Sequence, residues 1–315
     1  MSFRPRASPH AACLAAAAAA AVGASAARLA AVRPAEAATH ARAGAHVRAD
    51  VGLTGMTLVP AGWFTRGSNP DQAAAALALC AAEEKRAACD PDEVGDETPA
   101  RRLWLPAFAV DRGEATFGAY AACVEAARCT PSHYATDLPE AAGSADPRFD
   151  RPNLPVVGVT WDDAAAYCAF VGKRLPTEAE WEKAARGPDG WVWPWGDDWE
   201  EGRANHGGGA EPAYDAADGF LFTAPPGSFA RGASPYGAAD LAGNVWEWVA
   251  DFYERDYYAA APTVSPRGPE GGFFKGVRGG AWTSAPSHTR AARRGYDDPS
   301  RRTADTGFRC ARDAD

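Results

Sequence analysis

The chain has 315 residues, with 41 acidic and 32 basic side chains and a formal net charge of −9. A surface with this excess of negative charge repels the phosphates of nucleic acids and is not attracted to an anionic membrane. Neither is therefore expected as a partner. No glycine-rich phosphate loop stands between a strand pattern and a helix pattern, so nucleotide binding has no support either.

The first residues have the layout of a secretory signal peptide. Arg4 and Arg6 precede an alanine-rich apolar run over 11–22, and small residues then allow cleavage after residue 26 or residue 37. The run is shorter than the ~20 residues that a membrane-spanning helix needs, so no membrane span is expected. We therefore predict that 1–37 is a signal peptide and that the protein is exported, periplasmic or extracellular. The alternative is an alanine-rich disordered leader.

After the leader, residues 38–52 are interpreted as a linker, and 53–315 as one domain that can bury a single large core. Six cysteines remain there, and an even number in an exported chain favours disulfides, although some could be buried thiols. Spacing suggests two local bridges and one long-range bridge. The expected pairs are Cys80–Cys89, Cys123–Cys129 and Cys168–Cys310. The long-range bridge would contribute on the order of 4 kcal/mol in the chain-entropy model.

The first half of the domain alternates short strands and helices. Residues 56–68 predict two short strands about a Pro-Ala-Gly turn, and 69–100 form a polar, acidic excursion. Residues 103–127 predict a strand followed by a helix that begins near Thr116. Glycine, proline and aspartate dominate 131–155, which indicates irregular structure.

Two further helices are marked by their caps. Thr160 is followed at the third position by Asp163, and Thr177 by Glu180. In such a pair each side chain satisfies a backbone N–H that is otherwise unpaired at the start of a helix. The second helix should end at the glycine–proline pair of 187–188, because proline cannot continue it.

After residue 190 the helix signals vanish, and turns, glycines and aromatic residues dominate. Strands are expected only near 245–253, 274–282 and 306–312. The prediction is an α+β domain with little regular structure. A backbone with few helix and sheet hydrogen bonds needs other stabilising interactions, and disulfides and bound calcium are the candidates.

Four sequence strings in this order resemble the formylglycine-generating enzyme (sulfatase-modifying factor) family. They are KRLPTEAEWEKAARG at 173–187, LAGNVWEWVADFY at 241–253, GVRGGAWTS at 276–284 and GFRCA at 307–311. The resemblance extends from about Gly55 to Arg312. It implies an irregular single domain related to C-type lectins, and the family's pattern also pairs Cys168 with Cys310.

The resemblance also implies two calcium ions with a structural role. Calcium takes six to eight oxygen ligands in flexible geometry, which such loops can supply. The first set consists of the side chains of Asn205 and Asp218 and the backbone carbonyls of His206 and Phe220. The second set consists of the carboxylates of Asp240 and Glu247 and the backbone carbonyls of Gly243 and Val245. From spacing alone, each loop would be interpreted as a solvated turn.

Copper is not expected, because its ligands are missing. Family members that oxidise a substrate cysteine hold copper between two cysteine thiolates that follow a Gly-Gly-Ser-Phe stretch. This chain reads GGAWTSAPSHT at 279–289, where Ala281 replaces the serine and Ser284 and Thr289 replace the thiols. Hydroxyls are not soft ligands and do not substitute for thiolates. The chain is therefore expected to lack copper-dependent formylglycine formation.

The same cleft could instead bind a peptide or a small polar ligand beside Ser284, His288 and Thr289. The alternative is an enzyme that carries out another oxidation or a hydrolysis there, with Asp297 and Asp298 completing a Ser–His–Asp set or an iron site. However, the nucleophile-elbow motif is missing, and an iron facial triad needs two histidines.

Seven arginines crowd the segment 290–312, and they are expected to pair with the chain's own carboxylates. The alternative is that some recognise an acidic ligand. Trp246, Trp248 and Trp282 are expected in the core, where their indole N–H groups need acceptors.

Overall fold

The structure is a computed structural model that describes residues 54–85, 87–133, 148–208 and 216–314. All of them belong to the unit that runs from Asp50 to Asp315. The predicted signal peptide and linker lie outside the described residues. Within the described part, every helix is too short or too polar to cross a bilayer.

The regular elements are short and widely separated along the chain. The helices are α1 (Pro70–Glu83), α2 (Phe117–Glu125), α3 (Trp161–Phe170), α4 (Glu178–Arg186) and α5 (Tyr257–Ala260), with short 3-10 turns η1 (Pro91–Glu93), η2 (Gly95–Glu97), η3 (Ala230–Gly232) and η4 (Pro286–His288). The strands are β1 (Met56–Val59), β2 (Gly62–Arg66), β3 (Arg101–Leu105), β4 (Phe108–Asp111), β5 (Trp246–Phe252), β6 (Lys275–Arg278), β7 (Arg294–Asp297), β8 (Thr306–Gly307) and β9 (Ala311–Asp313). This confirms an α+β fold with little regular structure.

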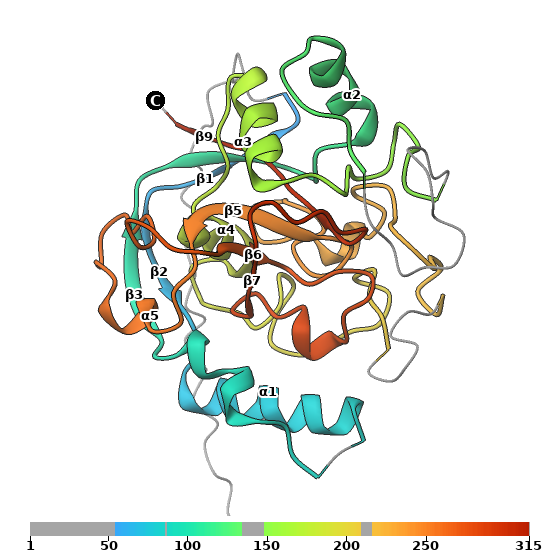
Figure 1. Cartoon of the computed structure of the whole chain (residues 1–315). Helices are drawn as coiled ribbons and strands as arrows, with labels where there is room; N and C mark the ends of the chain where they lie inside the picture. Colours follow the sequence, from blue (N-terminus) through green and yellow to red (C-terminus); the bar gives the residue numbers. More distant parts are fainter. Residues whose placement is uncertain (1–53, 86, 134–147, 209–215, 315) are drawn as a thin grey trace, which may run out of the picture. The chain divides into compact units, whose positions relative to one another are not determined.

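The described strands form three small sheets, ordered β1-β4-β9, β2-β3 and β7-β6-β5-β8. In the largest sheet, β5 pairs antiparallel with β6 and parallel with β8. Figure 1 shows β5, β6 and β7 side by side in the middle of the domain, with α4 beside them, while α1 and the pair α2–α3 lie at opposite ends. The register places Glu247 opposite Arg278, so β5 carries a carboxylate into the centre of the fold.

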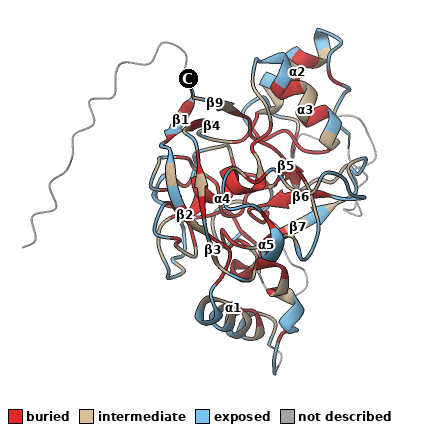
Figure 2. Ribbon diagram, turned by 90° about the vertical axis from the view of Figure 1, so that its left-hand side faces the viewer, coloured by how far each residue is buried: buried red, intermediate tan, exposed pale blue. Residues whose placement is uncertain are grey.

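Helix α4 lies in the core, and all nine of its residues are buried (Figure 2). Trp181 packs in the main apolar cluster, but the helix also buries charged side chains, which need partners there. Glu182 bonds Arg278 at 2.9 Å, and Glu178 bonds Arg278 at 2.9 Å and Arg294 at 2.8 Å. A buried ionic network therefore joins α4 to β6 and β7.

Both predicted capping boxes are present. Thr160 caps α3 by accepting from the Asp163 backbone N–H at 3.1 Å, and Thr177 caps α4 by accepting from the Glu180 N–H at 3.2 Å. Gly187 ends α4 with a positive φ of 69°. The cap sequences therefore placed both helices correctly.

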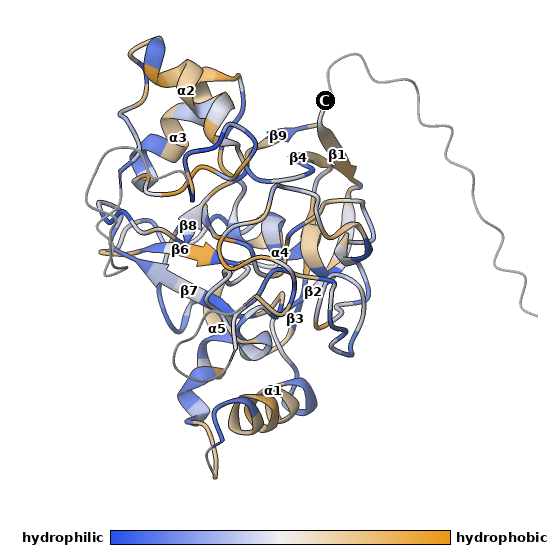
Figure 3. Cartoon of the chain, turned by 90° about the vertical axis from the view of Figure 1, so that its right-hand side faces the viewer, coloured by the Kyte–Doolittle hydropathy of each residue, from blue (hydrophilic) through white to orange (hydrophobic). Residues whose placement is uncertain are grey.

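Helices α1 and α5 and strand β7 depart from the expectations, since helix signals vanish from the sequence after residue 190 and yet α5 forms there. The excursion over 69–100 contains α1, whose capping box uses Asn69 and Gln72 with a proline in its first turn. Figure 3 shows α1 coloured largely as apolar. The middle of the helix is a run of alanine and leucine, whereas the residues on either side of it are polar. Strand β7 was also not predicted. Its four residues include an arginine, a glycine and an aspartate, and they extend only because they pair with β6.

All three expected disulfides are present, with Cα–Cα distances of 6.1, 5.4 and 5.6 Å for Cys80–Cys89, Cys123–Cys129 and Cys168–Cys310. These distances lie in the normal range for a bridge. The last bridge joins α3 to the segment just before β9 and spans 142 residues of sequence.

The arginines of 290–312 pair mostly inside the protein, as expected. The ion pairs are Arg290–Glu97, Arg293–Glu93, Arg294–Glu178, Arg301–Asp297, Arg302–Asp163 and Arg309–Glu247. Trp248 and Trp282 are buried, and their indole N–H groups donate to the carbonyls of Val159 and Ala304. Trp246 is only partly buried.

Candidate functional site

The two positions that replace copper thiols lie in the loop around η4, and both are buried. Ser284 Oγ accepts a hydrogen bond from the Ala281 N–H at 3.0 Å. Thr289 Oγ1 accepts from Trp193 Nε1 at 3.2 Å and donates to the Pro286 carbonyl at 2.9 Å. Both hydroxyls therefore hold the loop in shape, and neither supplies a soft ligand.

His288 lies on the same loop, and its side chain remains 30% exposed. Burial, together with the charge of Arg293, lowers its pKa to about 4, so the imidazole is neutral at pH 7. Its Nε2 lies 4.0 Å from Glu93 Oε2, too far for a hydrogen bond, and has no other partner among the described residues. Since the hydroxyl of Ser284 meets Ala281, the described contacts do not form a Ser–His pair.

Helix α1 packs against η4, so part of the predicted cleft is covered. The carboxylate oxygens of Glu83 accept from the Ser287 backbone N–H at 3.1 and 3.3 Å. Burial raises the pKa of Glu83. The segment that was interpreted as an excursion thus borders the loop that carries Ser284 and His288.

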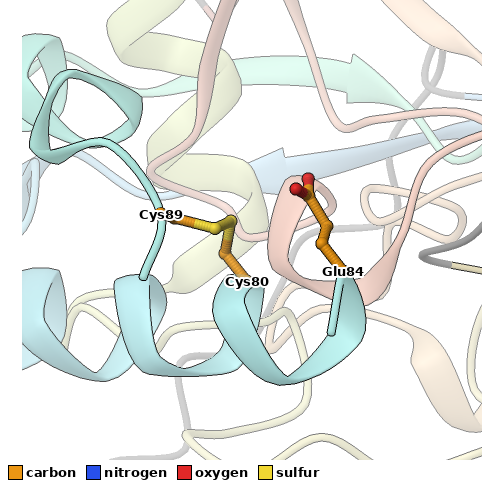
Figure 4. Close-up of side chains that lie close together, drawn as sticks. All are labelled: Cys80, Glu84 and Cys89. Carbon is orange, nitrogen blue, oxygen red and sulfur yellow. A yellow bond between two sulfur atoms is a disulfide. The ribbon is translucent and has the colours of Figure 1, made fainter. Parts of the chain in front are cut away.

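At the end of α1, Cys80, Glu84 and Cys89 bring possible metal-ligand atoms within 4.8 Å of one another (Figure 4). The two sulfurs are joined in a disulfide, as the figure shows, so neither is a thiolate. Because soft metals bind thiolates, this group does not provide a metal site in the oxidised protein.

The first predicted calcium loop is assembled around Asp218. Its two carboxylate oxygens accept from the backbone N–H groups of His206 at 2.8 Å and Phe220 at 2.9 Å. Asn205 is buried, and its Oδ1 has no partner among the described residues. A buried, unpaired oxygen is costly, and a hard cation would satisfy it. The four predicted residues therefore lie together and fit calcium.

The second predicted loop lies against the first. The Asn244 N–H donates to the Asn205 carbonyl at 2.8 Å, and Asn205 Nδ2 donates to Asn244 Oδ1 at 2.9 Å. Gly243 has a φ of +78°, and a Cβ there would stand 2.0 Å from the Asn205 oxygen. Only glycine allows this approach. Val245 is fully buried beside it.

In this second loop the carboxylate of Glu247 pairs with the guanidinium of Arg309, which also donates to the backbone carbonyl of Asp240. Glu247 accepts from Arg309 at 2.6 and 2.7 Å and from Trp181 Nε1 at 2.8 Å. Asp240 accepts from the Gly227 N–H at 2.5 Å. Both acids are buried, and Asp240 holds a positive φ of 57°.

Glu114 is the residue that the sequence analysis missed. It is buried beside Asp240, and its Oε1 accepts from Asn244 Nδ2 at 2.8 Å. Its Oε2 has no partner among the described residues. The signal in sequence was weak, because a glutamate between a strand and a helix cap is usually solvated.

Among the described residues, Arg309 supplies the positive charge that acts on all three buried carboxylates. Burial, followed by the charge of Asp240, raises the pKa of Glu114 well above its ordinary range. Burial also raises the pKa of Asp240. When all three acids are ionised, the cluster carries an excess of two negative charges, and a divalent cation would neutralise it. The donor set therefore fits calcium, with Glu114 beside the expected ligands.

Comparison with known proteins places these loops in a family. Residues 43–314 match the model of the sulfatase-modifying factor enzyme 1-like domain. The chain is 45% identical over 186 residues to the formylglycine-generating enzyme of Thermomonospora curvata, covering 56% of this chain and 60% of that protein. It is 39% identical over 180 residues to the inactive C-alpha-formylglycine-generating enzyme 2 of Mus musculus, covering 55% and 54%. The matches span little more than half the length of these curated relatives.

Among solved structures, PvdO from Pseudomonas aeruginosa is similar with a TM-score of 0.65 and 29% identity, over 82% of this chain and 94% of that chain. The family match covers most of the residues that carry the fold and both predicted calcium loops. The chain therefore belongs to the family of sulfatase-modifying factor enzyme 1-like domains.

Proposed function

We propose that this protein is an exported, calcium-stabilised binding domain of the formylglycine-generating type that does not form formylglycine. The observation that carries the proposal is the state of Ser284 and Thr289, whose buried hydroxyls are engaged inside the loop where copper thiolates would stand. A mammalian relative that is named inactive shares 39% identity over its matched region.

The ligand is a peptide or a small polar molecule bound beside the exposed part of His288. The imidazole is neutral at pH 7 and its side chain is 30% exposed, so the exposed part of the ring can contact such a ligand. The alternative, another oxidation or a hydrolysis at this loop, has less support, because the described contacts of Ser284 do not include His288. Stoichiometric redox metal in the purified protein would favour that alternative.

The proposal is tested with a cysteine-containing sulfatase-type peptide, copper, oxygen and a thiol reductant. The peptide mass should stay unchanged, whereas conversion of its cysteine to the aldehyde would overturn the non-oxidase assignment. The double variant Ser284→Cys/Thr289→Cys is the matched comparison. It should gain copper binding without necessarily gaining turnover, because Ala281 and its neighbours also differ from the oxidases.

A further inference from the structure

A cavity of about 470 Å³ lies between α3, the segment that precedes α4, the turn after β3 and the segment 265–267. None of Ser284, His288 and Thr289 lines it. Its volume falls within the range of small-ligand sites. The walls are largely apolar and include Leu105, Trp161, Ala165, Ala169, Leu175 and Ala250.

The carboxylates at this cavity are already paired. Each oxygen of Glu180 accepts from one terminal nitrogen of Arg174 at 2.7 Å, and Asp313 accepts from Arg174 Nε at 3.1 Å. Lys173, on the same wall, pairs with Asp111. These charges neutralise one another, so neither acid is available to a cationic ligand.

Arg267 is the remaining charged residue of the wall. It is exposed, and its guanidinium makes no hydrogen bond or ion pair within the described part of the chain. Arg174 and, more weakly, Arg267 lower the pKa of Asp313, so Arg267 acts on that acid from a distance. The side chain of Asp313 is 77% exposed, so water screens this attraction. The N–H donors of Arg267 are therefore open to a ligand.

Two hydroxyls on the same wall also have a proton to donate. Thr177 Oγ1 accepts from the Glu180 N–H at 3.2 Å, and Ser265 is held by its backbone N–H, which donates to the Trp104 carbonyl at 3.0 Å. Neither hydroxyl donates to an acceptor among the residues that the structure describes. Both residues are partly exposed and line the cavity. The unused polar groups of this wall are thus donors, which favours an anion.

The apolar wall beside these donors is held in place by the fold. Trp161 donates its indole N–H to the Val249 carbonyl at 2.7 Å, and Lys275 Nζ lies 3.8 Å from the centroid of its ring. Leu105 and Leu175 are only 2% and 4% exposed. Because the indole N–H is already used, the ring offers a ligand apolar surface.

We propose that this cavity binds a carboxylate on an apolar body, with the carboxylate on Arg267 and the body along Trp161 and Ala169. Both oxygens of a carboxylate match the fork of one guanidinium. Phosphate and sulfate suit the cavity less well, because they bring no apolar surface and the chain's net charge of −9 repels a dianion more strongly. The proposal stands independently of the function proposed for the His288 loop.

The test is saturation-transfer NMR on the full chain with two acids, 3-phenylpropionate and the peptide N-acetyl-Gly-Ala-Phe with a free C-terminus. The amides of both compounds are the uncharged controls. The acids should bind at millimolar concentration, at least about tenfold more tightly than their amides. Tighter binding of the peptide acid would identify a peptide C-terminus as the natural source, and equal or weaker binding a free acid. Failure of both acids to bind, or equal binding of their amides, would overturn the proposal.

The matched variants are Arg267→Gln and Arg301→Gln, since both arginines are exposed and only the first lines the cavity. Arg267→Gln should weaken binding of the acids about tenfold and leave the amides unchanged, as expected for loss of a charge-assisted hydrogen bond. Arg301→Gln should change neither. Ala169→Leu adds bulk at an exposed position of the wall and should weaken acids and amides alike. Unchanged acid affinity in Arg267→Gln or in Ala169→Leu would refute the assignment.

Discussion

At the scale of single residues, buried charge is the feature that most shapes this protein. Glu178 lies at the start of α4, where burial alone would raise its pKa, but Arg294 and Arg278 lower it to about 2. At the nearby Asp251 the charge of Arg294 does not outweigh burial. Its Oδ2 accepts from the Glu178 N–H at 2.8 Å, while burial and the charge of Glu178 raise its pKa to about 7.

This difference predicts a pH-dependent stability. An ordinary aspartate has a pKa of about 3.9, so the folded protein keeps a proton on Asp251 that the unfolded chain releases. The stability from this group is complete below about pH 4 and is lost as the pH rises through 7. Asp251→Asn has no proton to release. The unfolding free energy of wild type minus that of the variant should therefore fall between about pH 4 and pH 7, by at most about 1.4 kcal/mol per pH unit.

Urea unfolding at several pH values measures this quantity, and Asp298→Asn is the control because that side chain is exposed. A difference that stays constant across the range would show that Asp251 titrates normally.

Residue-level reasoning from sequence found Asp240, Glu247 and Asn205 but not Glu114. The first three are positions at which the resemblance to the family implies calcium ligands, whereas Glu114 reaches them only through the folded chain, by a hydrogen bond from Asn244. The partners of buried charges are set by tertiary contacts, which no local spacing reveals.

At the scale of elements, sequence signals predicted structure correctly where the interaction they describe joins residues close together in the chain. The caps at Thr160 and Thr177 predicted α3 and α4, because capping is a short-range interaction. Helix α1 has the same signal at Asn69 and Gln72, but the acidic residues around it concealed it. The strand expected near 306–312 is present as two short pieces, β8 and β9, whereas β7 was missed because it extends only by pairing with β6.

The disulfides fasten these short elements, and their loop lengths predict unequal effects. The Cys168–Cys310 bridge spans 142 residues, whereas Cys123–Cys129 spans 6. In the chain-entropy model, removing the long bridge should cost about 5 kcal/mol and the short one about 2 kcal/mol. Paired alanine variants of each bridge, compared by urea unfolding without reductant, test the order. Equal losses, or a larger loss for the short bridge, would contradict it.

At the scale of the whole molecule, two loops distant in sequence, around Asn205 and Asp240, meet at the Asn205–Asn244 contacts and are predicted to hold calcium. Calcium should raise the melting temperature, because a ligand that binds only the folded state stabilises it. Asp240→Asn should remove most of this increase. Without calcium the same variant should be as stable as wild type or more so at pH 7, since burial raises the pKa of Asp240 and its ionisation opposes folding.

Thermal unfolding with calcium and with chelator measures both effects. A calcium response that survives in Asp240→Asn and also in Asn205→Ala would place the ion elsewhere. A variant that is destabilised equally in both conditions would assign Asp240 a purely structural role.

The family and fold were predictable because four strings of sequence matched in order, and the family match over 43–314 confirms them. The packing of α1 on the η4 loop was not predictable, because α1 lies far from this loop in the sequence and no local pattern links the two.

The most direct test of the account is the metal content of the purified protein after exposure to calcium and Cu(I), followed by desalting and elemental analysis. We predict calcium at up to two ions per chain and no retained copper, because hard oxygen ligands are gathered in two loops and the thiolate positions carry Ser284 and Thr289. Copper retained at one ion per chain, with no calcium, would contradict it.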